Sequence, residues 1–293
     1  MKRKKAAKPL KILVTGSSGF VGSKTVKMLR ARGHEVTEFD LINSGHDDIR
    51  FDGMYERFLL RGHDVILHLA AIARFSDADR DPVLALETNV IGTRNVVRLA
   101  EEIGARLVYA STGSVYMPIN QEPPIKEDFK CTGNSVYGVT KYLGELAVRA
   151  SKTPWIVLRY AHLYGKEKRG HGLVGAFVDR IQRGLVPTYY GGQQSNDFTY
   201  IDDVARANVI ACEASWDKWY DIYNIGTGEE LTAEEAGAIL FEEMGYKGEV
   251  KHEKAREVDA SRFVFDTSKA ESKLVFKAKY DFRSGIRKML KEK

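Results

Sequence analysis

Cysteine is scarce in this sequence, and long apolar segments are missing from it. Only two of the 293 residues are cysteines, Cys131 and Cys212, and their spacing matches neither a metal site nor a redox pair. The longest apolar runs, residues 64–73 and 205–214, are shorter than the about 20 apolar residues that cross a bilayer. We therefore expect no metal, no membrane association and a location in the reducing cytoplasm.

Acidic residues are missing from the start of the chain. Five of the 45 basic residues lie in residues 1–8, so the other 40 match the 40 acidic residues. The net charge of +5 thus comes from a basic tail, predicted to be disordered over residues 1–9, and the neutral remainder does not favour a nucleic-acid partner. A short apolar strand follows the tail where a signal peptide would have a longer apolar segment and a cleavage site, so we expect no secretion.

What the sequence does contain is an alternation of strand-like and helix-like segments. Strands are expected at Lys11–Thr15, Glu35–Phe39, Val65–Ala70, Arg106–Ala110 and Trp155–Arg159, and helices at Gly19–Arg32, Pro82–Ile103 and Tyr137–Arg149. This alternation, with 43% hydrophobic residues, predicts an α/β fold in which a doubly wound parallel sheet (Rossmann) is covered by helices on both faces.

The regular alternation fades after Gly165, where glycine-rich and aromatic segments begin. Strands predicted at Phe198–Val204 and Asp221–Gly226 are expected to rejoin the sheet. We therefore predict two discontinuous parts, a larger domain of residues 10–165 with 197–226 and a smaller C-terminal substrate-binding lobe of residues 166–196 with 227–293.

A glycine-rich turn joins the first strand to the first helix. Gly16 permits a tight turn, Gly19 lets the backbone approach a diphosphate, and Gly22 lets the helix pack close to the strand. The N–H groups of the first helical turn, at Phe20, Val21 and Gly22, then face the diphosphate with the helix dipole behind them. The larger domain is therefore predicted to bind a dinucleotide.

An acidic residue ends the second strand. Asp40 lies 24 positions after Gly16, where a carboxylate can accept hydrogen bonds from both ribose hydroxyls of an adenosine. The carboxylate would repel a 2′-phosphate, and no arginine or lysine occurs in residues 41–47 to neutralise one. We therefore predict NAD as the cofactor.

Tyr137 and Lys141 lie at i and i+4 of a predicted helix, on the same face. A tyrosine with its ordinary pKa of about 10 is a poor base at neutral pH unless a positive neighbour stabilises the phenolate. Lys141 and an oxidised nicotinamide would supply that charge. About 25 residues upstream, the strand that ends in Ser111 and Thr112 supplies a hydroxyl that could bond a reacting substrate oxygen and relay its proton to Tyr137.

Several motifs in this order resemble those of the extended short-chain dehydrogenase/reductases, and in particular the NAD-dependent epimerase/dehydratase family with its UDP-glucose 4-epimerases. They lie at Thr15–Gly22, Leu69–Ala71, Thr88–Thr93, Tyr109–Tyr116, Ser135–Lys141, Leu158–Tyr160, Tyr164–Gly165 and Asp197–Val204. The resemblance covers nearly the whole chain.

The resemblance implies roles for residues that spacing alone does not assign. Tyr137 would be the catalytic base, Lys141 would also hold the nicotinamide ribose, and Thr112 would complete the triad. The further cofactor contacts that it implies are Asp48 and Ile49 beside the adenine, Leu69, Ala70 and Ala71 beside the nicotinamide ribose, and Asn89, Ser111 and Tyr160.

The residues after Thr112 separate the reactions of this family. By resemblance, 4,6-dehydratases place Asp-Glu there and decarboxylases tend to place a Glu second, whereas this chain has Gly113 and Ser114. A 4-epimerase needs no such pair, because the cofactor takes the hydride from C4 and returns it after the ketone has rotated. We therefore favour a sugar-nucleotide 4-epimerase. The alternatives are a 4,6-dehydratase, a 4-keto-sugar epimerase/reductase and an NAD-binding regulatory protein without turnover.

The resemblance also implies substrate contacts and an assembly. Ser114 would lie beside the sugar, and His162, where relatives often have asparagine, could contact substrate or be a buried, hydrogen-bonded histidine. Of two arginines that usually hold the nucleotide diphosphate, one is replaced by Asn196 and Arg256 could be the other or a surface ion-pair partner. We expect a nucleotide-sugar substrate, and a homodimer paired through the helices at residues 82–103 and 137–149.

Overall fold

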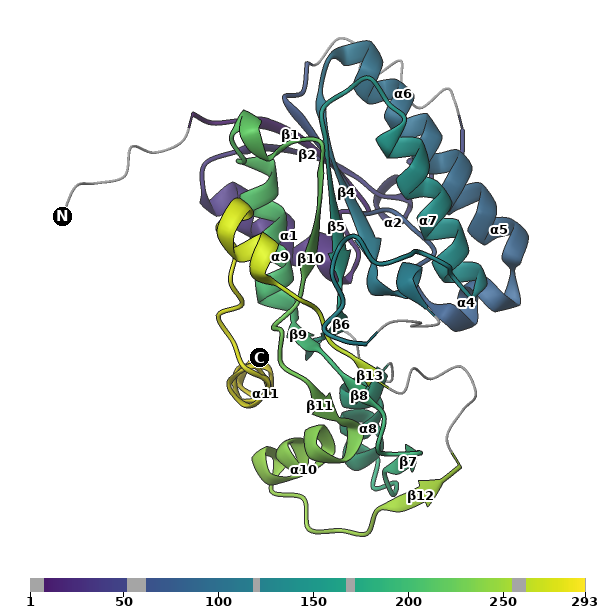
Figure 1. Cartoon of the computed structure of the whole chain (residues 1–293), viewed down its shortest axis with the longest axis vertical. Coiled ribbons are helices and arrows are strands. Elements are labelled where there is room, and N and C mark those ends of the chain that lie inside the picture. Colours follow the sequence, from purple (N-terminus) through teal and green to yellow (C-terminus); the bar gives the residue numbers. More distant parts are fainter. Residues whose placement is uncertain (1–7, 52–61, 118–121, 167–171, 255–261, 293) are drawn as a thin grey trace, which may run out of the picture. The chain divides into compact units, whose positions relative to one another are not determined.

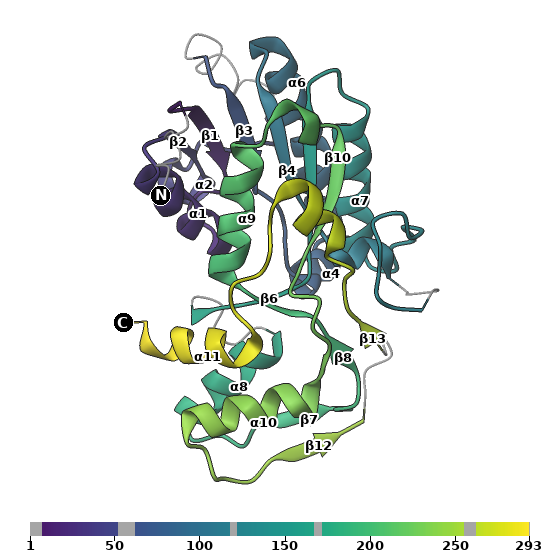
Figure 2. The same cartoon turned by 60° about the vertical axis from the view of Figure 1, so that its left-hand side comes forward.

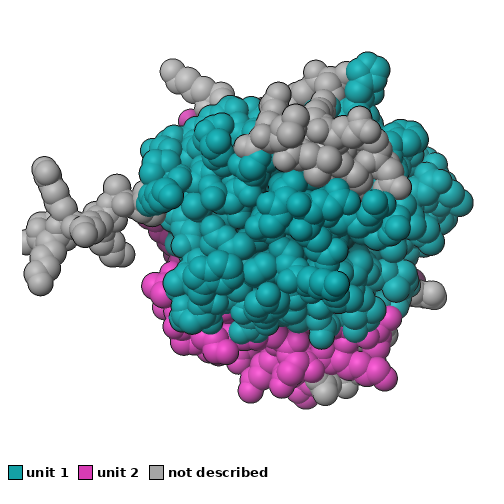
Figure 3. All heavy atoms as spheres, turned by 90° about the horizontal axis from the view of Figure 1, so that it is seen from above, with its two compact units in different colours: residues 1–115, 133–158, 205–222 teal, residues 116–132, 159–204, 223–293 magenta. Residues whose placement is uncertain are grey.

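The structure, a computed structural model, describes residues 8–51, 62–117, 122–166, 172–254 and 262–292. The chain divides into two compact units, which are coloured separately in Figure 3. The first unit comprises residues 1–115, 133–158 and 205–222, and the second comprises residues 116–132, 159–204 and 223–293. Residues 1–7 of the tail predicted to be disordered lie outside the described residues, and the predicted domain boundaries stay a prediction.

A six-stranded sheet, most of whose residues belong to the first unit, has the strand order β10-β5-β4-β3-β1-β2. Its strands are β1 (Lys11–Thr15), β2 (Glu35–Phe39), β3 (Val65–His68), β4 (Arg106–Thr112), β5 (Trp155–Tyr160) and β10 (Asp221–Ile225). The pairs β1–β2, β1–β3 and β3–β4 are parallel. The sheet confirms the predicted α/β, doubly wound class. Its strand order reverses beside β1, the place where ligands bind in such sheets.

Helices cover both faces of this sheet (Figures 1 and 2). They are α1 (Phe20–Ala31), α2 (Leu41–Ser44), α4 (Phe75–Arg80), α5 (Pro82–Leu86), η2 (Glu87–Gly92), α6 (Thr93–Ile103), η3 (Gly113–Tyr116), α7 (Val136–Arg149), α9 (Ile201–Cys212) and η5 (Trp216–Lys218). Helices α1 and α9 share one face, where Asn208 Nδ2 donates to Thr25 Oγ1 at 3.3 Å, and α6 and α7 cover the other.

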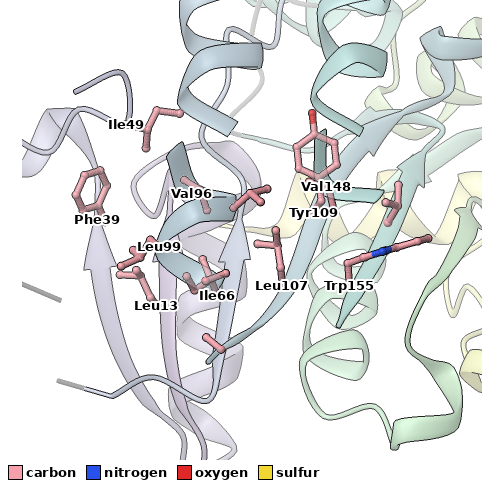
Figure 4. Packing of buried hydrophobic residues seen from close by; sticks show 14 residues of the cluster. Leu13, Phe39, Ile49, Ile66, Val96, Leu99, Leu107, Tyr109, Val148 and Trp155 are labelled. Carbon is pink, nitrogen blue, oxygen red and sulfur yellow. The ribbon is translucent and has the colours of Figure 1, made fainter. Parts of the chain in front are cut away.

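The main apolar core of the first unit lies between the sheet and the face formed by α6 and α7 (Figure 4). Leu13, Ile66 and Leu107 come from three adjacent strands, and Val96 and Val148 come from the two helices. Each is buried, and burying a side chain of this size stabilises a fold by about 1.5 to 3 kcal/mol. This packing fixes α7, the helix that carries Tyr137 and Lys141, against the end of β4.

Two predicted elements differ from the structure. The single helix predicted over Pro82–Ile103 is interrupted by a π turn, η2, in which the side chain of Asn89 bonds the backbone of Ile72. The strand predicted over Phe198–Val204 is wrong beyond Tyr200, because α9 begins at Ile201 and places two acids in its first turn, where the helix dipole favours them. The remaining strand pairs with β6 and does not join the six-stranded sheet.

The second unit consists of small sheets and helices. Its strands are β6 (His162–Tyr164), β7 (Thr188–Tyr190), β8 (Ser195–Asn196), β9 (Phe198–Tyr200), β11 (Leu231–Thr232), β12 (Lys251–Glu253) and β13 (Arg262–Phe263), and its helices are α8 (Gly172–Gln182), α10 (Ala233–Met244), η6 (Ala270–Leu274) and α11 (Phe282–Lys291). Phe177 of α8 stacks on Phe241 of α10 with ring centroids 5.4 Å apart. In the part of the chain that the structure describes, no helix is long and apolar enough to cross a membrane. The cytoplasmic location stays a prediction.

The packing of α7 gives a test of this arrangement. A Cβ on Gly144 would lie 2.5 Å from Tyr109 Oη and 2.6 Å from the Asn89 carbonyl oxygen. We expect Gly144→Ala to lower the free energy of unfolding by about 1 to 3 kcal/mol through overpacking. Thermal unfolding followed by circular dichroism measures the change, with Lys27→Ala on the exposed face of α1 as the control. Equal melting temperatures for Gly144→Ala and the control would contradict the packing described.

Candidate active site

The turn between β1 and α1 has the geometry predicted for a diphosphate site. Gly16 has φ +69°, and a Cβ there would lie 2.7 Å from the backbone nitrogen of Ala70, in the loop after β3. A Cβ on Gly22 would collide with the Gly16 carbonyl. The backbone of this turn is therefore packed closely against its neighbours, and only glycine fits at these two positions.

The start of α1 fits an anion. Gly19 caps the helix without a side-chain hydrogen bond, and no acidic residue lies in the first turn formed by Phe20 and its neighbours. Ser17 Oγ is buried and has no hydrogen-bond partner among the described residues. A helix N-terminus with a buried, unused hydroxyl beside it suits the diphosphate of a dinucleotide.

Asp40 connects the glycine turn to the end of β2, where the adenosine ribose is predicted to bind. One carboxylate oxygen accepts from the Ser18 backbone nitrogen at 2.9 Å, and the other accepts from the Ile42 backbone nitrogen at 3.0 Å and caps α2. The side chain is thus fixed at the end of β2, with lone pairs left for ribose hydroxyls.

The two residues predicted beside the adenine lie close to α6. Arg50 donates to both carboxylate oxygens of Asp48 and holds the pKa of that carboxyl below its ordinary value. Ile49 is buried against Gly92, and its carbonyl accepts from Asn95 Nδ2 at 3.0 Å. Arg50 is not among the site residues predicted from the sequence, although it lies only two positions after Asp48.

The loop after β3 is anchored on two sides. Leu69 and Ala70 donate their N–H groups to the carbonyl and hydroxyl of Thr15. Asn89, fully buried, accepts from the Ile72 backbone nitrogen at 2.9 Å and donates to Thr140 Oγ1 at 3.0 Å. Asn89 therefore links the loop that contains Ala71 to α7.

Thr112, Tyr137 and Lys141 come together in the first unit. Ser135 caps α7 by accepting from the Gly138 backbone nitrogen at 3.1 Å, and this fixes the first turn that carries Tyr137. Burial raises the pKa of Tyr137 above its ordinary value, and the nearby side chain of Thr112 opposes the rise. The protein without cofactor therefore holds Tyr137 as a neutral phenol at neutral pH.

Lys141 is almost completely buried. Its Nζ lies 4.2 Å from the centroid of the Tyr109 ring, a cation–π contact, and its carbonyl accepts from Tyr109 Oη at 3.1 Å. Burial lowers the pKa of Lys141 to about 7, and the negative charge of Glu145 opposes that decrease.

The site also contains three residues to which the sequence assigned no role: Glu145, Tyr109 and His68. Glu145 is fully buried one turn after Lys141, a spacing that was visible in the sequence, and it accepts from Ser111 Oγ at 3.0 Å. His68 lies between Thr15 and another threonine hydroxyl, and burial lowers its pKa to about 3, so it stays neutral. The predicted contact of Ser111 with the cofactor stays a prediction.

The remaining predicted residues, Tyr160, His162, Arg256 and Ser114, lie in different parts of the chain. Tyr160 is buried at the end of β5. His162 is exposed, with its ring edge-on to Phe263 at 5.1 Å, so the prediction of a buried histidine is wrong. Arg256 lies outside the described residues. Ser114 belongs to the first unit, where its hydroxyl accepts from Thr112 Oγ1 at 3.2 Å.

The chain is similar to known proteins over nearly its whole length. A sequence model of the NAD dependent epimerase/dehydratase family matches residues 12–226. A protein of Methanocaldococcus jannaschii named "Putative UDP-glucose 4-epimerase" is 31% identical, over 95% of this chain and 97% of that protein. UDP-glucuronic acid decarboxylase 1 of Arabidopsis thaliana is 30% identical, over 97% of this chain and 70% of the relative. Among solved structures, UDP-glucose 4-epimerase of Thermotoga maritima with UDP-glucose has a TM-score of 0.88 at 30% identity, over 96% of this chain and 97% of that one.

The position of Asp40 predicts how the site selects its dinucleotide. Asparagine at this position keeps the size of the side chain and an acceptor for α2 but removes the charge. We expect Asp40→Asn to bind NAD at least about tenfold more weakly, because hydrogen bonds to a charged group contribute about 1.5 to 3 kcal/mol. Isothermal titration calorimetry measures the dissociation constant. Glu38→Gln, on the same strand and paired with Arg30 at 2.7 Å, is the matched control. Equal NAD affinity of wild type and Asp40→Asn would exclude the ribose role.

Proposed function

The chain belongs to the NAD-dependent epimerase/dehydratase family and is an NAD-dependent enzyme of the extended short-chain dehydrogenase/reductase type, and from this premise we propose that it is a 4-epimerase of UDP-linked sugars. One observation carries the proposal. The side chain of Thr112, at the end of β4, lies close enough to Tyr137 to lower its pKa, and the residues that follow Thr112 are Gly113 and Ser114, which supply no acid or base for elimination or decarboxylation.

NAD, when bound, supplies a hydride acceptor and donor for C4 of the sugar. The chain has to move one proton: the phenol oxygen of Tyr137 takes it from the 4-hydroxyl, directly or through Thr112, and returns it after the ketone has rotated. Only the phenolate can take that proton. Since burial raises the pKa of Tyr137 in the free protein, positive charge in the completed site is needed, and the ammonium group of Lys141 contributes it.

The small side chains beside Thr112 support epimerisation over the other reactions. The 4-keto sugar has to turn over between two hydride transfers, and Gly113 and Ser114 leave room for that rotation. The Arabidopsis thaliana relative favours decarboxylation as a second candidate function. A 4,6-dehydratase lacks its expected acid and base here, because Gly113 and Ser114 follow Thr112. A 4-keto-sugar epimerase/reductase that uses NADPH is disfavoured by Asp40, whose carboxylate would repel a 2′-phosphate. A regulatory protein that binds NAD without turnover is the weaker alternative, because Thr112, Tyr137 and Lys141 are all present.

We propose that the nucleotide end of the substrate binds the smaller lobe, residues 166–196 with 227–293. Asn196 of this lobe is partly exposed and His162, which precedes the lobe in the sequence, is exposed, so both can contact a ligand. Arg256 is proposed as the cation for the diphosphate. Ser114, hydrogen-bonded to Thr112, is proposed to contact the sugar.

We propose a homodimer formed through α5 and α7. Val83 and Leu86 of α5 are exposed, and so are Val139, Leu143 and Leu146 of α7, which recur at helical spacing. The two helices contact each other in the first unit, so these side chains form one apolar surface. A second copy of the chain, with the same surface, would cover it.

The substrate of the wild-type enzyme and the role of Tyr137 can be tested together. The protein with NAD is incubated with UDP-, GDP- and dTDP-hexoses and with UDP-glucuronate, and products are separated by chromatography and mass spectrometry. We expect the 4-epimer of a UDP-sugar. We also expect Tyr137→Phe to reduce kcat by orders of magnitude and to leave NAD affinity nearly unchanged, because only the proton acceptor is lost.

Each other outcome identifies a different function. A UDP-pentose with carbon dioxide from UDP-glucuronate would establish a decarboxylase, and a 4-keto-6-deoxy sugar would establish a dehydratase. Binding of NAD with no product from any sugar would favour the regulatory protein. Full activity of Tyr137→Phe would remove Tyr137 from the mechanism.

The proposed dimer predicts the effect of a charge on the apolar surface. We expect the wild type to have the mass of two chains in light scattering and Leu143→Glu to have the mass of one, since a carboxylate buried there would have no partner. Leu185→Glu, at an exposed leucine of the second unit, is the matched control and should remain dimeric. A monomeric wild type, or a dimeric Leu143→Glu, would show that this surface is not the interface.

A further inference from the structure

A buried carboxylate lies next to the site, and the proposed mechanism does not use it. Glu145 of α7 has no exposed surface. One of its oxygens accepts from Ser111 Oγ at 3.0 Å, and the other lies 3.8 Å from Nη1 of Arg149, whose side chain is partly exposed. An ionised carboxylate is costly to bury, and an apolar side chain of similar volume would fill this space at lower cost.

The position of Glu145 indicates what its charge acts on. It follows Lys141 by four residues, so both side chains lie on the face of α7 that packs against β4. Ser111, near the end of β4, faces this side of the helix and donates its hydroxyl to the Glu145 carboxylate. One short segment of helix thus presents an acid and a base to the same strand.

Few other groups around Lys141 stabilise its ammonium form. The groups that face it are His68 on β3, Tyr109 on β4, and Tyr137 and Glu145 on its own helix. His68 is neutral because burial holds its pKa near 3, and Tyr109 offers an aromatic face and no net charge. The negative charge in this set comes from Glu145.

We propose that Glu145 is a positioning residue that stabilises the ammonium form of the buried Lys141 and that Ser111 fixes the carboxylate in place. The consequence for turnover rests on the proposed role of Lys141 in stabilising the phenolate. The charge on Lys141 itself does not depend on which sugar is the substrate.

The direction of the titration follows from the charges. Burial lowers the pKa of Lys141 to about 7 even with Glu145 opposing, so loss of that charge lowers the pKa further. Lysine is protonated below its pKa, so at pH 7 about half of Lys141 would be an ammonium group in the wild type, whereas most of it would be a neutral amine in the variant without the acid. As the pH is raised, the rate of this variant should therefore begin to fall at a lower pH than the rate of the wild type.

The experiment is a lysine titration in the full-length protein. Glu145→Gln keeps the size of the side chain and its bond to Ser111 but removes the charge. Lysine labelled with ¹³C at Cε is incorporated, and the Lys141 signal is identified by its loss in Lys141→Met. We expect the midpoint of the Lys141 titration to decrease by about one pH unit in Glu145→Gln. Glu102→Gln, which changes an acid on α6 whose side chain is half-exposed, is the control and should leave the midpoint unchanged.

Two further variants keep the test decisive if Glu145→Gln does not fold. Glu145→Asp should retain the wild-type midpoint, and Ser111→Ala should decrease it, because the carboxylate loses its donor. With an active enzyme, the basic limb of the kcat profile should move by the same amount while KM changes little.

An unchanged Lys141 midpoint in a folded Glu145→Gln, or in Ser111→Ala if Glu145→Gln does not fold, would overturn the proposal. The titration is measured in the free protein, so it remains informative if the sugar panel yields no epimer. Failure of the proposed function is seen in the products of the wild type, and failure of this inference is seen in the NMR signal.

Discussion

The cost of keeping a lysine charged inside the protein is the constraint on which the site depends. Lys141 lies over the ring of Tyr109, and burial alone would favour the neutral amine. Three neighbouring side chains limit the lowering of the Lys141 pKa by burial, each in a different way. Tyr109 offers the negative face of its ring, Glu145 supplies a charge, and His68 stays neutral and so adds no like charge. A helix with lysine and acid one turn apart satisfies these requirements within a single segment.

The position of the site follows from the sheet. Because the strand order reverses beside β1, the glycine turn after β1 lies against the loop after β3, close enough that Gly16 cannot carry a Cβ. Asn89 then connects that loop to α7 through Thr140. The phosphate turn and the triad, which are far apart in the sequence, are therefore joined within the first unit by a few short hydrogen bonds.

The sequence predicted the parts of this arrangement that depend on local spacing. The glycines of the turn lie three positions apart and Tyr137 and Lys141 lie four apart, while Asp40 ends the strand that follows the first helix. Their positions on strand ends and on a helix face follow from such local patterns. The bond between Ser111 and Glu145 joins residues 34 positions apart, and packing decides it. The π turn and the start of α9 were missed for a related reason, since side-chain bonds and first-turn acids override apolar patterning.

Asp40 has a consequence for engineering the cofactor. Its carboxylate is a shared acceptor: it accepts from Ser18 in the phosphate turn and also caps α2. Recognition of the ribose and the shape of the turn are thus coupled through one side chain. A redesign for a phosphorylated dinucleotide would have to supply a cation for the phosphate and also a new acceptor for the Ser18 amide. A single substitution at this position would remove the repulsion of the phosphate but leave the Ser18 amide without its acceptor.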